Sequence, residues 1–201
     1  MADTNVSLYE IELRLAKSRD FDFTKKLVVF NVYGTGGVLP LWHECDVLVC
    51  TKLGYLSEIE IKRSYADFLN DFKKDHMHAS QYIKNFYYCV PNKIKDKVIE
   101  HLQTLDDKDW RKGAGIIVYY EDNDWIDIKL LPYENKKCIK LTTEQMLYLA
   151  RLGSMRVMTL KRKVLRIEKQ LKDSIDTIKE LEKRLEEKYD KLDVVDEQKT
   201  E

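Results

Sequence analysis

Carboxylates and a lysine gather in one short stretch of the chain, residues 44–62 (ECDVLVCTKLGYLSEIEIK). Its second half alternates, so that Glu58, Glu60 and Lys62 share one face of a strand while the isoleucines between them share the other. Carboxylate oxygens are the ligands that Mg²⁺ prefers, and a nearby lysine can stabilise charge that develops on a phosphate. The stretch therefore indicates metal-assisted chemistry on a phosphate ester.

The two halves of this stretch are predicted to form a β-hairpin. Residues 52–54 (KLG) suit a three-residue loop whose last glycine takes up a left-handed backbone. In that register Asp46 faces Glu60 and Glu44 faces Lys62, with Cβ atoms about 4.5–5.5 Å apart. Two carboxylates at this distance repel each other unless a divalent cation lies between them. An ordinary amphipathic hairpin with its charged face in solvent is the alternative, and alternation alone does not decide between the two.

Helix-like and strand-like patterns alternate around the hairpin. Thr4 or Ser7 is a candidate cap for the first helix, and Ser64 with Asp67 forms an S-x-x-D capping box for the second. The succession predicts an α/β domain over residues 1–150. The expected helices cover residues 4–21, 64–85 and 92–103, and the expected strands cover residues 26–33, 38–50, 55–62, 86–91, 114–122 and 125–131.

The last quarter of the chain follows a different pattern. Nine apolar residues keep a 3-4 heptad spacing, interrupted at Ser174 and Lys188, and charged residues leave only a narrow apolar seam. The spacing favours a coiled-coil helix over residues 151–192, followed by a disordered acidic tail at 193–201. A single amphipathic helix packed on the domain is the alternative. The seam residues are Val157, Leu160, Val164, Ile167, Leu171, Ile178, Leu181, Leu185 and Leu192.

Basic and acidic residues are unevenly distributed along this predicted helix. Residues 151–172 contain eight basic residues and one acidic residue, whereas residues 173–201 contain eleven acidic and six basic residues. A basic segment beside an active site would suit nucleic acid, and a solvated coiled-coil surface is the alternative. The candidate nucleic-acid contacts are Lys73, Lys74, Arg156, Lys161, Arg162 and Lys163.

Overall composition narrows the class of protein. Lys and Arg together number 35, as do Asp and Glu, and this neutrality argues against a protein that coats polyanions in general. Cys45, Cys50, Cys89 and Cys138 have no spacing typical of a zinc site, and three of them lie in apolar runs. We therefore expect reduced core cysteines. No signal-like or membrane-spanning run is evident, which predicts a cytoplasmic protein that does not bind membranes.

The order of Asp46, a hairpin and Glu60-Ile61-Lys62 resembles the D…(D/E)xK core of the PD-(D/E)xK nuclease superfamily. The segments that follow resemble its MmcB-like branch, which is associated with DNA repair. That resemblance covers roughly residues 40–156 and implies a restriction-endonuclease-like mixed sheet flanked by helices, to which the coiled coil is an addition. It is carried by CDVLVC (45–50), EIEIKRSYADF (58–68), FYYCVP (86–91), AGIIVYYED (114–122) and KLTTEQMLYLARLGSMR (140–156).

The resemblance implies a metal-dependent DNA nuclease. Asp46 and Glu60 would hold Mg²⁺ or Mn²⁺, and Lys62 would be the catalytic lysine. The superfamily often adds a glutamate from the preceding helix, which here is Glu10 or Glu12.

Two departures from the family pattern concern the same hairpin. Cys45 stands where a proline often precedes the aspartate, and Glu44 and Glu58 crowd the carboxylate face, where Glu44 is a further candidate ligand. The alternative function is a DNA-binding or assembly module of the same fold that does not cleave DNA and acts through its coiled coil. In either case we expect a homodimer or a partner protein held by the coiled coil, in the cytoplasm of a bacterial or phage-infected cell.

Overall fold

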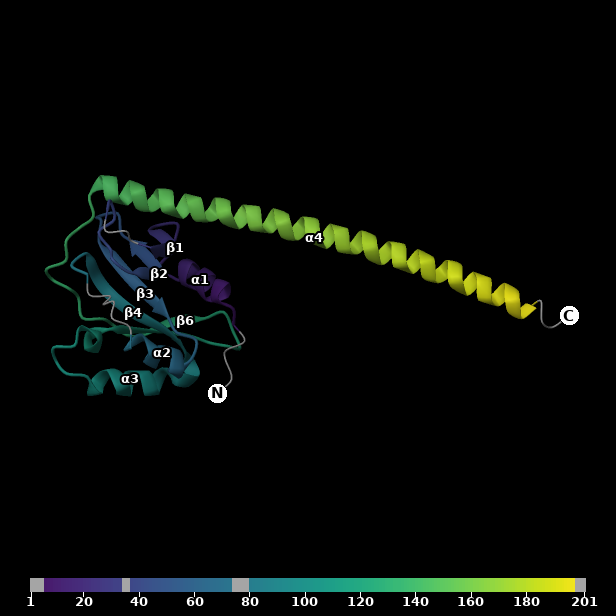
Figure 1. Ribbon diagram of the computed structural model, residues 1–201. Helices are drawn as coiled ribbons and strands as arrows, with labels where there is room; N and C mark the ends of the chain where they lie inside the picture. Colours follow the sequence, from purple (N-terminus) through teal and green to yellow (C-terminus); the bar gives the residue numbers. More distant parts are fainter. Residues whose placement is uncertain (1–5, 34–36, 74–79, 198–201) are drawn as a thin grey trace. The chain divides into compact units, whose positions relative to one another are not determined.

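The computed structural model describes the backbone of residues 6–33, 37–73 and 80–197, and side chains as far as residue 186. A mixed sheet flanked by helices is followed by a long C-terminal helix, which confirms the predicted α/β class (Figure 1). The chain divides into two compact units, Met1–Ser154 and Met155–Glu201. The first unit contains the whole sheet and every residue of the predicted hairpin.

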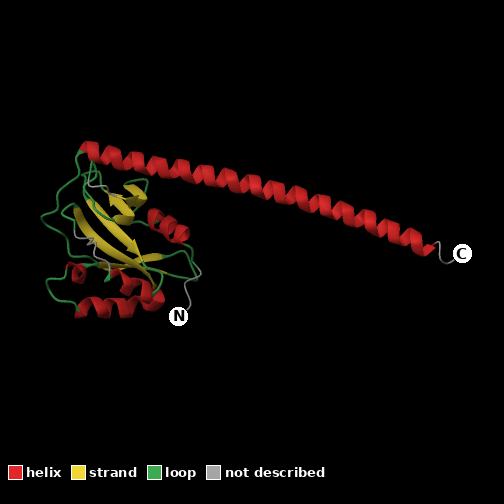
Figure 2. Cartoon of the chain, in the orientation of Figure 1, coloured by secondary structure: helices red, strands yellow, loops and turns green. Residues whose placement is uncertain are grey.

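Helices and strands alternate through most of the first unit (Figure 2). In chain order the elements are α1 (Leu8–Lys17), β1 (Leu27–Tyr33), β2 (Glu44–Cys50), β3 (Leu56–Ile61), α2 (Tyr65–Asp71), β4 (Ile83–Pro91), the 3₁₀ turn η1 (Asn92–Ile94), α3 (Lys95–Thr104), the 3₁₀ turn η2 (Trp110–Gly113), β5 (Gly115–Tyr119), β6 (Ile126–Leu130) and α4 (Thr143–Glu197).

The six strands lie in the sheet in the same order as in the chain, β1-β2-β3-β4-β5-β6. Antiparallel pairing joins β1 to β2, β2 to β3, and β5 to β6. The central pairs β3–β4 and β4–β5 are parallel. Parallel neighbours need a crossover, and α2 and α3 supply one each.

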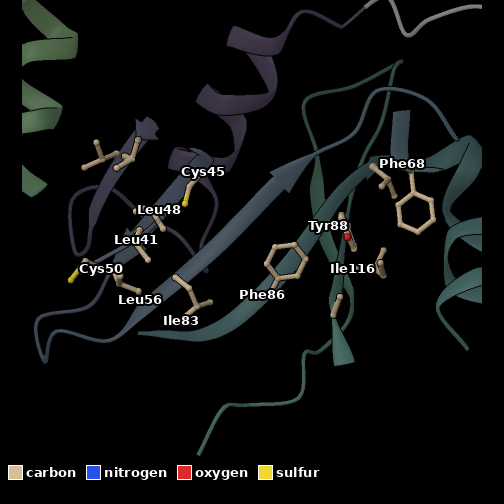
Figure 3. Packing of buried hydrophobic residues seen from close by; sticks show 14 of the residues in the cluster. Leu41, Cys45, Leu48, Cys50, Leu56, Phe68, Ile83, Phe86, Tyr88 and Ile116 are labelled. Carbon is tan, nitrogen blue, oxygen red and sulfur yellow. The ribbon is translucent and has the colours of Figure 1, made fainter. Parts of the chain in front are cut away.

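Both faces of the sheet are covered. Phe68 of α2, Val98 and Leu102 of α3, and Leu149 of α4 belong to one core cluster (Figure 3). Residues of α1 cover the other face. The charged face of β3 is therefore in the interior, with Glu58 fully buried, and a solvent-exposed carboxylate face is ruled out for this hairpin.

A left-handed residue, Asn31 (φ 51°), interrupts β1. Asparagine adopts this backbone more readily than most residues. In a regular strand, side chains two positions apart lie on the same face. Beside this interruption, side chains three positions apart do so instead: Val29 with Val32 in β1, and Cys45 with Leu48 in β2. The switch of face turns Cys45 toward the core cluster that contains Tyr88 and Phe68 (Figure 3).

The predicted register of the hairpin is confirmed over its paired length. Four residue pairs run from Cys50↔Leu56 to Val47↔Ile59, and the Gly54 amide donates to Thr51 O at 2.9 Å. Gly54 has a φ of +84°, as the three-residue loop requires. The ladder ends at Val47↔Ile59, so Asp46 and Glu60 are not a ladder pair.

Several helix boundaries differ from those predicted: α1 ends at Lys17 instead of residue 21, and α3 begins at Lys95, after the 3₁₀ turn η1. Ser7 caps α1 through a capping box with Glu10, while Thr4 lies outside the described residues. The helix α2 ends at Asp71, well short of the predicted residue 85. Its cap differs too, because the Asp67 carboxylate accepts from the amide of Arg63 instead of that of Ser64.

The long helix α4 begins eight residues before the predicted start. The Thr142 hydroxyl accepts from the Gln145 amide and the Gln145 side chain accepts from the Thr142 amide, which is a complete capping box. Its first turns belong to the first unit, where Leu149 is buried. The helix continues to Glu197, into the segment that was expected to be disordered.

In the second unit every described side chain is exposed. The seam residues from Val157 to Leu185 are each 46–59% exposed, so the apolar stripe has no cover within this unit. Leu192 lies beyond the described side chains.

Candidate functional site

Lys62 follows β3 directly and is only 2% exposed. Its Nζ donates to Glu60 Oε1 at 2.9 Å and to Asp71 Oδ1 at 2.8 Å. Burial lowers the pKa of Lys62, but the two carboxylates outweigh burial and hold that pKa above its usual value. The side chain is therefore an ammonium ion at neutral pH, suited to stabilising negative charge and not to accepting a proton.

Asp71, at the end of α2, is a member of this group that sequence reasoning missed. It is 4% exposed, and its second oxygen accepts a hydrogen bond of 2.9 Å from the hydroxyl of Tyr88. Burial and the Asp71 charge raise the pKa of Tyr88, so the tyrosine remains a donor. The sequence contains one sign of this role. Asp71 comes three residues after Phe68 and directly before Phe72, at the spacing of a buried helix face.

The two carboxylate oxygens of Glu60 differ in their contacts. Oε1 accepts from Lys62, whereas the buried Oε2 has no hydrogen-bond partner among the described residues. A buried oxygen without a partner costs about 1–3 kcal/mol, and a cation ligand would remove that cost. Glu60 therefore fits the role of a metal ligand.

Asp46 lies where β2 and β3 stop pairing. Its Oδ2 accepts a hydrogen bond of 2.8 Å from the amide of Ile61, in place of a backbone carbonyl. The charge of Asp46 raises the pKa values of the Cys89 and Cys45 thiols, in each case after the larger effect of burial, so the carboxylate lies near both thiols. Half-buried Asp46 is more accessible than Glu60 or Lys62.

The two candidate glutamates of α1 have separate roles. Glu10 is exposed and binds the Ser7 amide and hydroxyl as part of the helix cap. Glu12 is 6% exposed, and its Oε1 accepts from Asn31 Nδ2 at 3.0 Å. Burial and then the Asp46 charge raise the pKa of Glu12, which means that the two carboxylates lie close together. Of the two glutamates, Glu12 is therefore the one on which the Asp46 charge acts.

Glu44 and Lys73 make contacts outside this group. Glu44 is exposed and pairs with Tyr33 of β1, and it does not face Lys62. Lys73 is exposed and binds Asn70, and Lys74 lies outside the described residues. The other predicted nucleic-acid contacts are exposed residues of the second unit: Arg156, Lys161, Arg162 and Lys163.

A second buried cluster lies on the face of β3 that carries Glu60. His43 Nε2 and Glu58 Oε1 are 2.8 Å apart, and donor atoms of His43, Cys45 and Glu58 all lie within 4.8 Å of one another. Burial, and then the charges of Glu58, Glu60 and Asp46, raise the pKa of the Cys45 thiol, so without a cation it keeps its proton.

The expectation for the cysteines holds for three of the four. Cys45, Cys50 and Cys89 are buried and Cys138 is partly exposed, and all four are free thiols.

A hollow of about 800 Å³ lies between the outer face of α1 and β6. Glu10 contributes to its lining, together with Arg14 and Asp127, whereas Glu12 and Asp46 do not. The buried charges therefore do not open into this hollow.

Comparison with known proteins adds little about activity. No protein-family model and no curated protein matches the chain. Among solved structures it is similar to a protein of unknown function from Silicibacter pomeroyi, with 17% sequence identity and a TM-score of 0.47 over 81% of this chain and 93% of that one. Among the described residues, no helix has the length and hydropathy that a membrane crossing requires.

Proposed function

We propose that this protein is a metal-dependent DNA nuclease of the PD-(D/E)xK type, of the MmcB-like branch. The observation that carries the proposal is the buried Lys62 ammonium between two carboxylates, next to a Glu60 oxygen that has no partner among the described residues. Glu60, Asp46 and Glu12 would hold Mg²⁺ or Mn²⁺, because all three offer carboxylate oxygens. A bound Mg²⁺ would polarise a phosphodiester and lower the pKa of a water molecule.

The protein's own residues would stabilise charge on the phosphate and hold the metal ligands in place. The Lys62 ammonium stabilises the charge that develops on the phosphate oxygens. Asp71 retains a 2.8 Å contact with Lys62, so the ammonium keeps a partner when Glu60 turns to a cation. Asn31 holds the Glu12 carboxylate by its 3.0 Å hydrogen bond, and the Ile61 amide holds that of Asp46.

The test is cleavage of labelled single-stranded, duplex and branched DNA with Mg²⁺, Mn²⁺ or EDTA. Asp46→Asn and Glu60→Gln keep an oxygen acceptor but lose the charge, and we expect each to lower the rate about 100-fold or more. Glu44→Gln is the matched control, because Glu44 lies on the same strand as Asp46 but is exposed. This variant should cleave normally. Thermal unfolding of each variant checks that the fold is intact.

Two results would overturn the proposal. If the wild type cuts none of the substrates with either metal, the protein is not a nuclease of this type. If cleavage occurs and Asp46→Asn and Glu60→Gln cleave as well as the control does, the active site lies elsewhere.

The second candidate is a DNA-binding or assembly module of the same fold without catalysis. The exposed apolar seam of α4 favours it, since such a stripe is suited to a second helix. A homodimer or a partner protein joined through α4 is compatible with both candidates. DNA binding without cleavage would support this second function.

A further inference from the structure

A zinc site is the strongest inference outside the residues already assigned to cleavage. We propose that His43, Cys45 and Glu58 bind one Zn²⁺ ion. Donor atoms of the three side chains lie within 4.8 Å of one another, and none of the three residues is more than 4% exposed. The proposal stands whether or not the protein cleaves DNA.

The mixture of donors selects the metal. Imidazole nitrogen, thiolate sulfur and carboxylate oxygen together are typical of Zn²⁺, whereas Mg²⁺ and Ca²⁺ prefer oxygen alone. The Cys45 thiolate and the Glu58 carboxylate would supply two negative charges. They balance the two positive charges of the ion, so the complex is neutral in a dry interior.

The backbone brings the three donors together from β2, from the residue just before it and from β3. The change of face beside Asn31 turns Cys45 toward the core cluster on the Glu58 side of the sheet. His43 lies two residues before Cys45, and Glu58 comes from the neighbouring strand β3. The sequence gives little sign of such a site. Glu58 comes from the other strand of the hairpin, and the two-residue spacing of His43 and Cys45 is not typical of zinc sites.

The distances require little rearrangement. His43 Nε2 and Glu58 Oε1 are 2.8 Å apart and already converge. Ligands about 2.0–2.1 Å from a tetrahedral ion are about 3.3 Å apart, so a separation of roughly half an ångström is enough for this pair. The Cys45 sulfur lies within 4.8 Å of both donors and would have to move inward to complete the site. The fourth position is left to a water molecule.

Nearby charge also favours a cation at this point. Asp46 directly follows Cys45, and Glu60 lies two residues from Glu58 on the same face of β3. Binding would release the thiol proton to solvent as the sulfur–zinc bond forms, with no oxidation or reduction. The ion would then join β2 to β3 near the point where their backbone pairing ends.

The experiment begins with full-length protein freed of metal by a chelator. Zinc titration should give one equivalent bound in the micromolar range or tighter. Cobalt, used as a spectroscopic substitute, should produce the near-ultraviolet charge-transfer band of a cobalt–thiolate bond. A large excess of Mg²⁺ should not remove that band, which separates this site from the carboxylate group proposed for cleavage.

Variants then identify the ligands. Cys45→Ser and His43→Gln should weaken zinc binding by about 100-fold or more, since they replace direct ligands. Cys50→Ser is the matched control, because Cys50 is also buried, in the same strand and the same core cluster. It should keep both the affinity and the cobalt band.

The proposal is overturned if wild-type protein shows no cobalt–thiolate band, or if Cys45→Ser binds zinc as tightly as the Cys50→Ser control. The wild-type spectrum alone decides the matter where a variant fails to fold. In that negative case His43, Cys45 and Glu58 form a hydrogen-bonded group of the core and nothing more.

Discussion

At the scale of single residues, the group around Lys62 shows how the interior of this sheet accommodates charged side chains. A buried lysine is stable only if its charge is matched, and here two carboxylates contact the same Nζ. A tyrosine hydroxyl and the charge on Lys62 in turn satisfy Asp71. The three charges and the hydroxyl therefore depend on one another, and the loss of one member affects the rest.

Lys62→Met should destabilise the protein by about 3–5 kcal/mol, because it leaves the Glu60 and Asp71 carboxylates buried without their cation. Urea denaturation monitored by circular dichroism measures the change. Lys73→Met, on an exposed lysine, is the control and should stay within about 0.5 kcal/mol of wild type. Equal stabilities for the two variants would contradict the coupled group.

The two glutamates of α1 should respond to pH with opposite signs. Because the pKa of Glu12 is raised in the folded protein, its contribution to stability is present at acid pH and is lost as the pH rises through that pKa. Glu12→Gln keeps the acceptor for Asn31 but carries no charge. It should therefore be more stable than wild type at pH 7, with the gain disappearing near pH 4.

Glu10 is the matched control for this measurement. Its hydrogen bonds with Ser7 lower its pKa, so its contribution is present above the ordinary glutamate pKa and lost as the pH falls. Glu10→Gln should reduce stability at pH 7. Urea midpoints of both variants at pH 4 and pH 7 give the test, and the same sign for both would contradict it.

The sequence could predict some residues of the site and not others. Asp46, Glu60 and Lys62 stand out because their spacing on a hairpin is visible in the chain. The choice between Glu10 and Glu12 depends on which of them turns toward β1, and it is Glu12, on the buried face of α1, that contacts Asn31. Asp71 joins the group through the packing of α2; its place beside Phe68 and Phe72 indicates burial but not the contact with Lys62.

At the scale of elements, the loop of the hairpin fixes the register of β2 and β3. Gly54 has a positive φ, and a Cβ atom built there would lie 2.7 Å from Leu141 O. The loop therefore excludes other residues for two independent reasons. This position was predictable from the chain, since a three-residue hairpin loop places a left-handed residue, most readily a glycine, at its last position.

Gly54→Ala should cost about 2 kcal/mol or more, from the unfavourable φ and from the approach to Leu141 O. Gly153→Ala makes a matched comparison within α4. The nearest atom to an added Cβ there is Val29 Cγ2 at 3.4 Å, an ordinary contact, so this change should be neutral or stabilising by up to about 1 kcal/mol. Thermal unfolding distinguishes the two, and similar effects would contradict the argument.

Element boundaries were the weaker part of the sequence prediction. The strand ends beside the hairpin loop were predicted to within one residue, because alternation and the loop agree, whereas β2 begins at Glu44, six residues after the predicted start. The start of α4 was missed, since its capping box lies in a polar stretch before the heptads begin. The predicted extension of α2 was wrong, because its aromatic spacing ends with Phe72 while polar residues continue the apparent helix.

At the scale of the whole molecule, α4 presents its apolar seam to solvent in the second unit. A homodimer formed through this seam is expected to depend on residues of the heptad and not on apolar residues elsewhere on the helix. Ile167 lies in the seam and Leu165 lies outside it, and both are exposed.

Ile167→Asp should weaken the dimer by about 100-fold or more, because a charge would enter the buried seam. Leu165→Asp, on the same helix, should leave it unchanged. Size-exclusion chromatography with light scattering measures the mass of each. A monomeric wild type would contradict the homodimer and point to another protein as the partner of α4.

The order of the strands has a consequence for how this chain is made. Since β1 to β6 are neighbours in the order of synthesis, each new strand can add to an edge that already exists, and none has to enter between two earlier ones. Lys62 meets Asp71 only nine residues later, and Tyr88 follows Asp71 by seventeen. On the ribosome, the charged interior can therefore be completed as soon as β4 has emerged, before β5 and β6 have emerged.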